Sequence, residues 1–257
     1  MTMQKLMMSL IATSAMSCAA VADSPNVYLP RYRKPVISWE GPYLGLAAGG
    51  RWMDPTWSTT STASGPVFDS TTAYANLPSN APRGALFAGY NWQNVNALWG
   101  IEADVGVSSH KAQVSDIPGT YTPPATGQDR LAIKAGTDGS LRLRTGILVN
   151  PGTLFYATGG LALQEVKVTA SCATTGSWCL SNFDRNETVA KTLTGWTLGG
   201  GAEMLVNIDW FARLEYRYAD FGRFEQKFFT AAPPGDEFTG NAKIRTQTIS
   251  LGLAHKF

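Results

Sequence analysis

The chain has 257 residues and a formal net charge of +2 at pH 7, so its charge gives no reason to expect nucleic-acid binding. Charged residues make up 16% of the chain and glycines number 26. Soluble domains usually carry roughly 25% charged residues. The composition is typical of a membrane β-barrel or of a secreted β-sandwich, and it excludes neither.

The first 22 residues have the features of an export signal. Lys5 supplies a positive charge, Leu6 to Met16 form a short apolar run, and Ala20-Val21-Ala22 has the form of a cleavage site. The apolar run is too short to span a bilayer as a helix, which needs about 20 residues. We therefore expect a signal peptide over residues 1–22, with cleavage before Asp23.

Residues 23–38 contain three prolines and no hydrophobic periodicity, so we expect a flexible periplasmic tail. From Trp39 onward, segments with apolar residues at every second position alternate with turns and loops. This alternation predicts β-strands with one apolar face. Eight such segments lie at about residues 43–51, 84–93, 97–106, 141–149, 153–165, 192–205, 210–218 and 243–257.

The connections between these segments alternate in length. Short turns are expected near residues 94–96, 150–152 and 207–209, and long loops at about 52–82, 107–139, 166–191 and 222–242. The apolar faces carry no Asp, Glu, Lys or Arg. This is expected of faces that contact lipid, because an Arg or Lys facing lipid at mid-membrane costs about 2–4 kcal/mol. After the signal, no run of 18 apolar residues is present to form a transmembrane helix.

These patterns predict an all-β fold: an eight-stranded antiparallel transmembrane β-barrel with up-and-down meander topology over residues 39–257. Short turns and both termini would lie in the periplasm, and the long loops would lie outside the cell. The protein would then be located in the outer membrane of a Gram-negative bacterium.

The charged residues inside the predicted strands fall on the face opposite the apolar one, which would line the lumen. They are Glu102, Asp104, Arg142, Arg144, Glu203, Arg213, Glu215 and Arg217. One register would pair Glu102 with Arg144 and Asp104 with Arg142, and a turn around Ile208 would pair Glu203 with Arg213. We expect a lumenal network of charge-assisted hydrogen bonds.

The alternative role for these carboxylates is acid–base catalysis. An arginine beside each carboxylate favours its charged form, which is unsuited to a general acid. The two histidines also form no evident triad: His110 follows Ser108 and Ser109, and adjacent residues in an extended strand point apart. We therefore predict no catalytic residue, no cofactor site and no metal site.

Two cysteines, Cys172 and Cys179, remain once the signal is removed. They lie seven residues apart in a stretch rich in Ser, Thr and Gly. In an oxidising compartment such a pair is expected to form a disulfide that closes a small loop. A metal site is the alternative, but the stretch contains no histidine.

Short motifs recur in a fixed order along the chain. They are Trp39-Glu40-Gly41-Pro42-Tyr43-Leu44-Gly45, Gly89-Tyr90-Asn91-Trp92-Gln93, Gly100-Ile101-Glu102-Ala103-Asp104, Gly195-Trp196-Thr197, the segment 214–222 and the segment 251–257. The ordered set resembles small outer-membrane immunogenic, porin-family proteins of rhizobia and related bacteria, over essentially the whole mature chain. Pro42 departs from the family, which commonly has a bulky apolar residue there.

This resemblance implies an eight-stranded outer-membrane barrel, surface exposure, and a terminal aromatic residue read by the barrel-assembly machinery. The residues of that assembly signal would be Ile249, Leu251, Leu253 and Phe257. The family does not imply a settled molecular activity.

We expect a structural and surface-interaction role for the barrel. Its partners would be outer-membrane lipid, lipopolysaccharide, the barrel-assembly machinery and a host or environmental ligand at the loops, but no nucleic acid. A narrow diffusion porin is the second hypothesis, although about eight strands enclose only enough space for side chains, and open porins use 16 or more. A lipid-modifying enzyme is a third.

Overall fold

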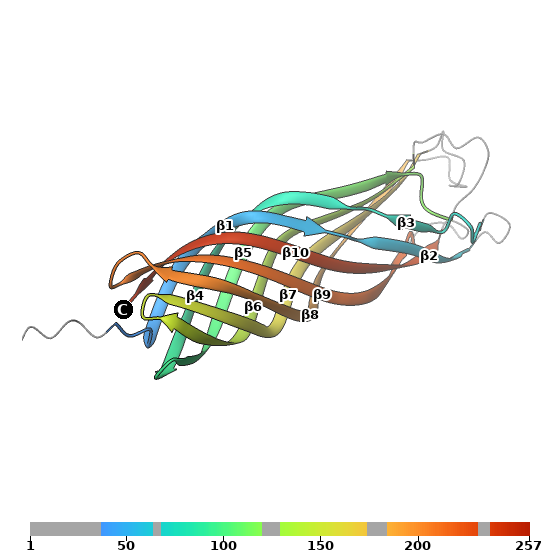
Figure 1. Cartoon of the computed structure of the whole chain (residues 1–257). Helices are drawn as coiled ribbons and strands as arrows, with labels where there is room; N and C mark the ends of the chain where they lie inside the picture. Colours follow the sequence, from blue (N-terminus) through green and yellow to red (C-terminus); the bar gives the residue numbers. More distant parts are fainter. Residues whose placement is uncertain (1–36, 64–67, 120–128, 174–183, 231–236) are drawn as a thin grey trace, which may run out of the picture. The chain divides into compact units, whose positions relative to one another are not determined.

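The computed structural model describes residues 37–63, 68–119, 129–173, 184–230 and 237–257. The predicted signal peptide, and all of the predicted tail except its last two residues, lie outside this part of the chain. Ten strands occur among the described residues (Figure 1): β1 (Gly41–Met53), β2 (Thr56–Thr62), β3 (Tyr74–Asn76), β4 (Ser79–Asn94), β5 (Ala97–Ser115), β6 (Arg130–Asn150), β7 (Thr153–Cys172), β8 (Arg185–Leu205), β9 (Trp210–Phe228) and β10 (Phe238–Lys256). No helix in the described ranges is long and apolar enough to cross a membrane.

Eight of these strands form a closed ring. The order is β1-β4-β5-β6-β7-β8-β9-β10, every neighbouring pair is antiparallel, and β1 pairs with β10 to complete the circle. Figure 1 shows the strands following one another with a common tilt, as barrel closure requires. The predicted eight-stranded antiparallel meander is confirmed.

The two extra strands continue the first hairpin rather than widening the ring. β2 follows β1 after Asp54 and Pro55 and pairs with the first residues of β10, 238–243. β3 precedes β4 and pairs with β2. Pro55 lies between β1 and β2 and Pro78 between β3 and β4, and neither has an N–H to donate to the ladder. The Leu77 N–H bonds to the Pro55 carbonyl at 2.9 Å, which keeps the two breaks together.

The strands are longer than predicted, and the long loops are correspondingly shorter. β7, for example, reaches Cys172 rather than ending near Glu165. Its outward residues are apolar up to Leu163, whereas beyond it the outward residues are Glu165, Lys167 and Thr169 and the buried ones are apolar. The apolar pattern thus changes faces partway along the strand, and a search for lipid-facing alternation stops at that point.

In each strand of the ring, the part nearest the tight turns contributes to a lipid-facing band of exposed apolar side chains. Leu46, Leu143 and Leu251 are 63%, 69% and 67% exposed, respectively. This band is where the predicted outward residues lie. Exposed Trp92, Trp99 and Trp210 lie toward its turn end, where amphipathic rings favour a membrane interface.

The tight turns, the start of β1 and the chain end lie at the same end of the barrel. Trp39 Nε1 donates to the Pro151 carbonyl at 3.0 Å, the Lys256 N–H donates to the Asp209 carbonyl at 2.7 Å, and the Phe257 N–H donates to the Pro42 carbonyl at 3.0 Å. The opposite end carries β2 and β3 (Figure 1).

Two apolar clusters fill the interior. The turn-side cluster consists of Trp39, Tyr43, Phe87, Leu98, Leu148, Leu154, Tyr156, Phe211 and Ala254. The loop-side cluster includes Met53, Trp57, Ile117, Leu131, Ile133, Val166, Val168, Phe221, Phe224, Phe228 and Phe238. The loop-side cluster lies beyond the lipid-facing band. There the inward side chains are apolar and the outward ones are polar, as in a sheet that faces water on one side.

Candidate functional site: a charged layer across the barrel

A layer of buried charges separates the two apolar clusters. Along β9 the inward residues run from Phe211 through Arg213, Glu215 and Arg217 to Phe221. The arginines and carboxylates of this charged layer are Arg51, Arg83, Glu102, Asp104, Asp138, Arg142, Arg144, Glu203, Arg213, Glu215 and Arg217. Each of these side chains is at most 8% exposed.

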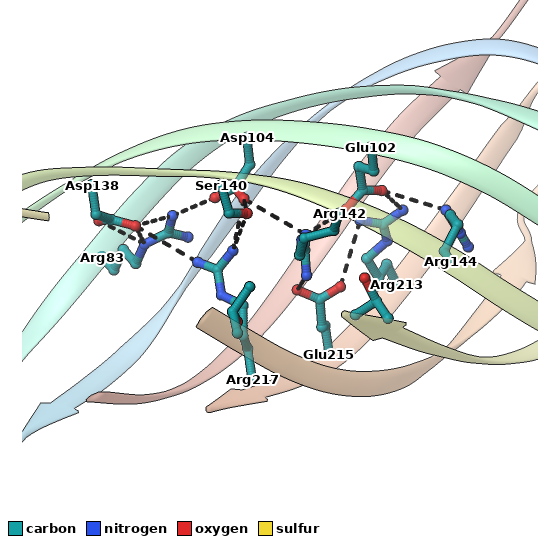
Figure 2. A network of polar contacts seen from close by, with 12 residues as sticks. Arg83, Glu102, Asp104, Asp138, Ser140, Arg142, Arg144, Arg213, Glu215 and Arg217 are labelled. Carbon is teal, nitrogen blue, oxygen red and sulfur yellow. Dashed lines mark hydrogen bonds and ion pairs between the residues drawn. The ribbon is translucent and has the colours of Figure 1, made fainter. Parts of the chain in front are cut away.

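Glu102 on β5 is the centre of one half of the layer. Its carboxylate lies 2.5 Å from Arg142, 2.6 Å from Arg213 and 3.4 Å from Arg144. The Tyr43 hydroxyl from β1 donates to the same carboxylate at 2.7 Å. Four strands of the ring therefore meet at one side chain, and Figure 2 shows Glu102 beside Arg142, Arg144 and Arg213.

Asp104 and Asp138 form the centre of the other half. Arg83 from β4 bridges them at 2.6 Å to each, and Arg217 from β9 contacts Asp104 at 2.7 Å. Ser140 also donates to Asp104. Arg51 from β1 contacts Asp138 at 2.6 Å (Figure 2 shows the Arg83, Ser140 and Arg217 contacts).

The remaining ring strands also reach the layer. Glu203 on β8 lies 2.6 Å from Arg213 and 2.9 Å from Arg144. On β7, the Tyr156 hydroxyl donates to Glu215 at 2.7 Å, and on β10, Thr246 accepts from Arg51 at 3.2 Å. All eight strands of the ring thus contribute a contact, so the layer connects strands on opposite sides of the barrel.

Arginine faces also stack on the aromatic rings of the turn-side cluster. The guanidinium carbon of Arg213 lies 4.1 Å from the centre of the Phe87 ring, and that of Arg144 lies 4.3 Å from the centre of the Tyr156 ring. At such distances a guanidinium is attracted to the face of the ring. The charged layer and the turn-side cluster therefore pack as one plug.

The structure brings the eight predicted lumenal residues together, but the predicted β5–β6 register is wrong. Glu102 lies opposite Arg142, and Asp104 lies opposite Ser140. The predicted partners still interact diagonally, with Glu102 3.4 Å from Arg144 and Asp104 3.7 Å from Arg142. Because an arginine side chain spans neighbouring positions, charge pairing does not determine the register. The predicted Glu203–Arg213 pairing is confirmed.

Arg51, Arg83 and Asp138 also belong to this layer but are not among the eight predicted lumenal residues. The four arginines and four carboxylates predicted there become six arginines and five carboxylates. Arg51 shares the parity of the lumen-facing Gly45 and Gly49, so a signal for it existed. Arg83 lies one residue before the predicted strand 84–93, and Asp138 lies in the predicted loop 107–139, because the predicted strands are too short.

This arrangement favours a structural role over chemistry. Every carboxylate of the layer lies within ion-pair distance of at least one guanidinium, so each is held in a paired, buried position. His110 lies beyond this layer, with its Nδ1 3.3 Å from the Ser79 hydroxyl. Among the described residues, no group of three or more His, Cys, Asp or Glu side chains could hold a metal ion.

Two other predicted groups lie elsewhere. Ile249, Leu251, Leu253 and Phe257 are all exposed on the outer surface, and Phe257 is the most exposed at 71%. Buried Cys172 ends β7, whereas Cys179 is outside the described residues, so their disulfide stays a prediction.

Comparisons with known proteins agree with this architecture. A family model described as "Outer membrane protein beta-barrel domain" matches residues 8–257. The chain is 30% identical over 246 residues to the 25 kDa outer-membrane immunogenic protein of Brucella abortus biovar 1 (strain 9-941), covering 96% of this chain and 92% of that protein. It is 31% identical over 188 residues to the 22 kDa outer membrane protein of Rhizobium leguminosarum bv. viciae, covering 73% and 67%. The crystal structure of the outer membrane protein OprG from Pseudomonas aeruginosa has a similar fold, with a TM-score of 0.53, 12% identity, and coverage of 85% and 97%.

Proposed function

Because the chain belongs to the outer membrane β-barrel protein family of bacteria, we propose that it is a structural and surface-interaction barrel with a closed lumen. The observation that carries this proposal is the charged layer, which contacts all eight ring strands and is packed between two apolar clusters. A diffusing solute would have to displace paired charges that are almost fully buried, and this is costly in a low-dielectric interior.

In this proposal the tight turns and both chain ends lie in the periplasm, and the loop-side end rises above the outer leaflet. Ile249, Leu251, Leu253 and Phe257 would be read by the barrel-assembly machinery, because the first three are exposed on β10 and exposed Phe257 directly follows that strand. The loop-side end would contact lipopolysaccharide and present loops to a host or the environment. The word "immunogenic" in the names of the relatives supports a surface antigen role.

Conductance in planar bilayers tests the closed lumen. We expect pure protein to produce no stable open steps under conditions where a 16-stranded porin, the positive control, conducts. Eight strands enclose only enough room for side chains, and here those side chains are interlocked. A reproducible open channel would overturn the proposal and support the narrow diffusion porin instead.

A non-enzymatic role belongs to the same proposal, since the relatives are named as outer-membrane immunogenic proteins and the carboxylates of the layer are all paired. Lipid A from cells with and without the protein should have the same mass spectrum. A change in acylation that depends on the protein would favour a lipid-modifying enzyme.

A further inference from the structure

Three lysines form one row on the outer surface of the barrel, just beyond the lipid-facing band. Lys111 on β5 lies opposite Lys134 on β6, and Lys134 lies opposite Lys167 on β7. All three are exposed. Like charges directly opposite one another destabilise a sheet, so this lysine row needs a reason other than the folding of the barrel.

The row borders a hollow of about 520 Å³, which we call the basic hollow. Two β-bulges, at Ser108–Ser109 on β5 and at Gly136–Thr137 on β6, interrupt the ladder and form part of its wall. The other lining residues are His110, Lys111, Lys134, Ala135, Glu165 and Lys167. Glu165 is the single carboxylate, and it lies 3.3 Å from Lys167. Within this lining, two of the three lysine charges therefore have no carboxylate to balance them.

A second hollow of about 300 Å³ adjoins the first on the side of the lipid-facing band. The two share Thr137 and Glu165, and the second is also lined by Val105, Asp138, Gly139, Leu163, Gln164 and Thr192. Asp138 and Gln164 are buried and bond to Arg51 inside the barrel, so we call this second space the apolar hollow. Val105 and Leu163 are among the exposed apolar side chains of the band. A cationic site thus lies directly beside a groove open to hydrocarbon.

We propose that the two hollows together bind one phosphorylated glycolipid of the outer leaflet, lipopolysaccharide. Its phosphate groups would lie among Lys111, Lys134 and Lys167, and an acyl chain would lie in the apolar hollow. The charge excess and the position at the membrane boundary select an anionic amphiphile over nucleic acid or a soluble anion. This inference rests on the proposed orientation, which puts the loop-side end in the outer leaflet.

The test uses the full mature barrel in detergent micelles and, as probe, deep-rough lipopolysaccharide carrying two lipid A phosphates. We expect K111Q/K134Q/K167Q to bind it roughly 100-fold more weakly, since each lysine near an anionic lipid surface contributes about 1 kcal/mol. The matched control, R130Q/R223Q/K227Q, removes three exposed cations of the loop-side half that lie outside the row. It should bind within about threefold of the parent barrel.

Two further arms identify the ligand and keep the test independent of folding. Monophosphorylated lipopolysaccharide should bind more weakly than the bisphosphorylated form to the parent but not to the triple variant. Inorganic phosphate alone should compete poorly, because it cannot occupy the apolar hollow. Heat-dependent mobility on SDS gels checks that each variant is folded, and K134Q alone provides a milder variant with an expected loss of about fivefold.

Equal losses in both triple variants would overturn the site, and so would unchanged binding in K111Q/K134Q/K167Q. Stronger binding of phosphatidylglycerol vesicles than of lipopolysaccharide would also overturn it. A preference for this phospholipid would indicate that the lysine row lies in the inner leaflet. None of these results depends on conductance, so the lipid site and the closed lumen can fail separately.

Discussion

At the scale of single residues, Glu102 determines the integrity of the charged layer. Three arginines and the Tyr43 hydroxyl contact its carboxylate. We expect Glu102→Gln to lower the free energy of unfolding by about 3–5 kcal/mol, because it leaves buried guanidinium groups uncompensated. Urea unfolding in lipid vesicles, followed by tryptophan fluorescence, measures this.

The control is Glu165→Gln, which removes an exposed carboxylate that pairs with Lys167 at 3.3 Å. An exposed pair contributes about 0–1 kcal/mol. Equal losses for the two variants would show that the charged layer contributes no more than a surface pair.

We expect His110 to make the stability of the barrel depend on pH. It lies beyond the lipid-facing band, and burial, together with the nearby charge of Arg51, lowers the pKa of its imidazole to about 4. The unfolded chain takes up this proton near pH 6.5. As the pH falls from 6.5 to 4, stability should therefore decrease by about 1 kcal/mol per unit at most.

This contribution should be fully present above pH 6.5. Replacing the residue, as His110→Gln, should remove the corresponding slope from a plot of the urea midpoint against pH. An unchanged slope in that variant would assign the acid sensitivity to other groups.

At the scale of elements, closure of the ring depends on small residues where β1 meets β10. A Cβ added at Gly49 would collide with the Ile249 carbonyl and the Ser250 backbone. We expect Gly49→Val to weaken the barrel by about 1–3 kcal/mol through overpacking, and to reduce the folded band on heat-modifiable SDS gels.

Gly84 offers a matched control, because a Cβ there has no neighbour within 4 Å. Gly84→Val should leave the folded fraction unchanged. If both variants misfold equally, the collision with the β10 backbone at Gly49 is not the cause of the misfolding.

The elements also explain why the predicted strands are shorter than the observed ones. In β7 the apolar side chains switch from the outer to the inner face beyond Leu163. In β6 the bulge at Gly136–Thr137 changes the facing instead, so that Ile133 is buried although Leu141, with the same parity, is exposed. Lipid and water impose opposite patterns on one continuous strand.

At the scale of the whole molecule, the proposed orientation predicts which turns are accessible from outside the cell. An epitope inserted after Thr71, in the exposed turn begun by Asp69, should be labelled by antibody on intact cells. The same epitope inserted after Ile208, in the tight turn between β8 and β9, should be labelled only after permeabilisation. The reverse result would show that the barrel has the opposite orientation in the membrane.

The sequence by itself determined the ring of eight strands, its antiparallel order and the lipid-facing residues. Lipid tolerates no unpaired backbone and no charge at mid-membrane, so these features leave a periodic pattern in the chain. The eight lumenal charges were visible for the same reason, as polar residues opposite an apolar face.

Only the tertiary structure decided which charges pair, how far the strands continue, and that Arg51, Arg83 and Asp138 complete the layer. Arginine reaches several partners across the barrel axis, so pairing depends on register and on strands far apart in the sequence. The lysine row likewise exists only after two bulges align β5, β6 and β7. Contacts between distant strands leave no period in a sequence, and three-dimensional packing alone specifies them.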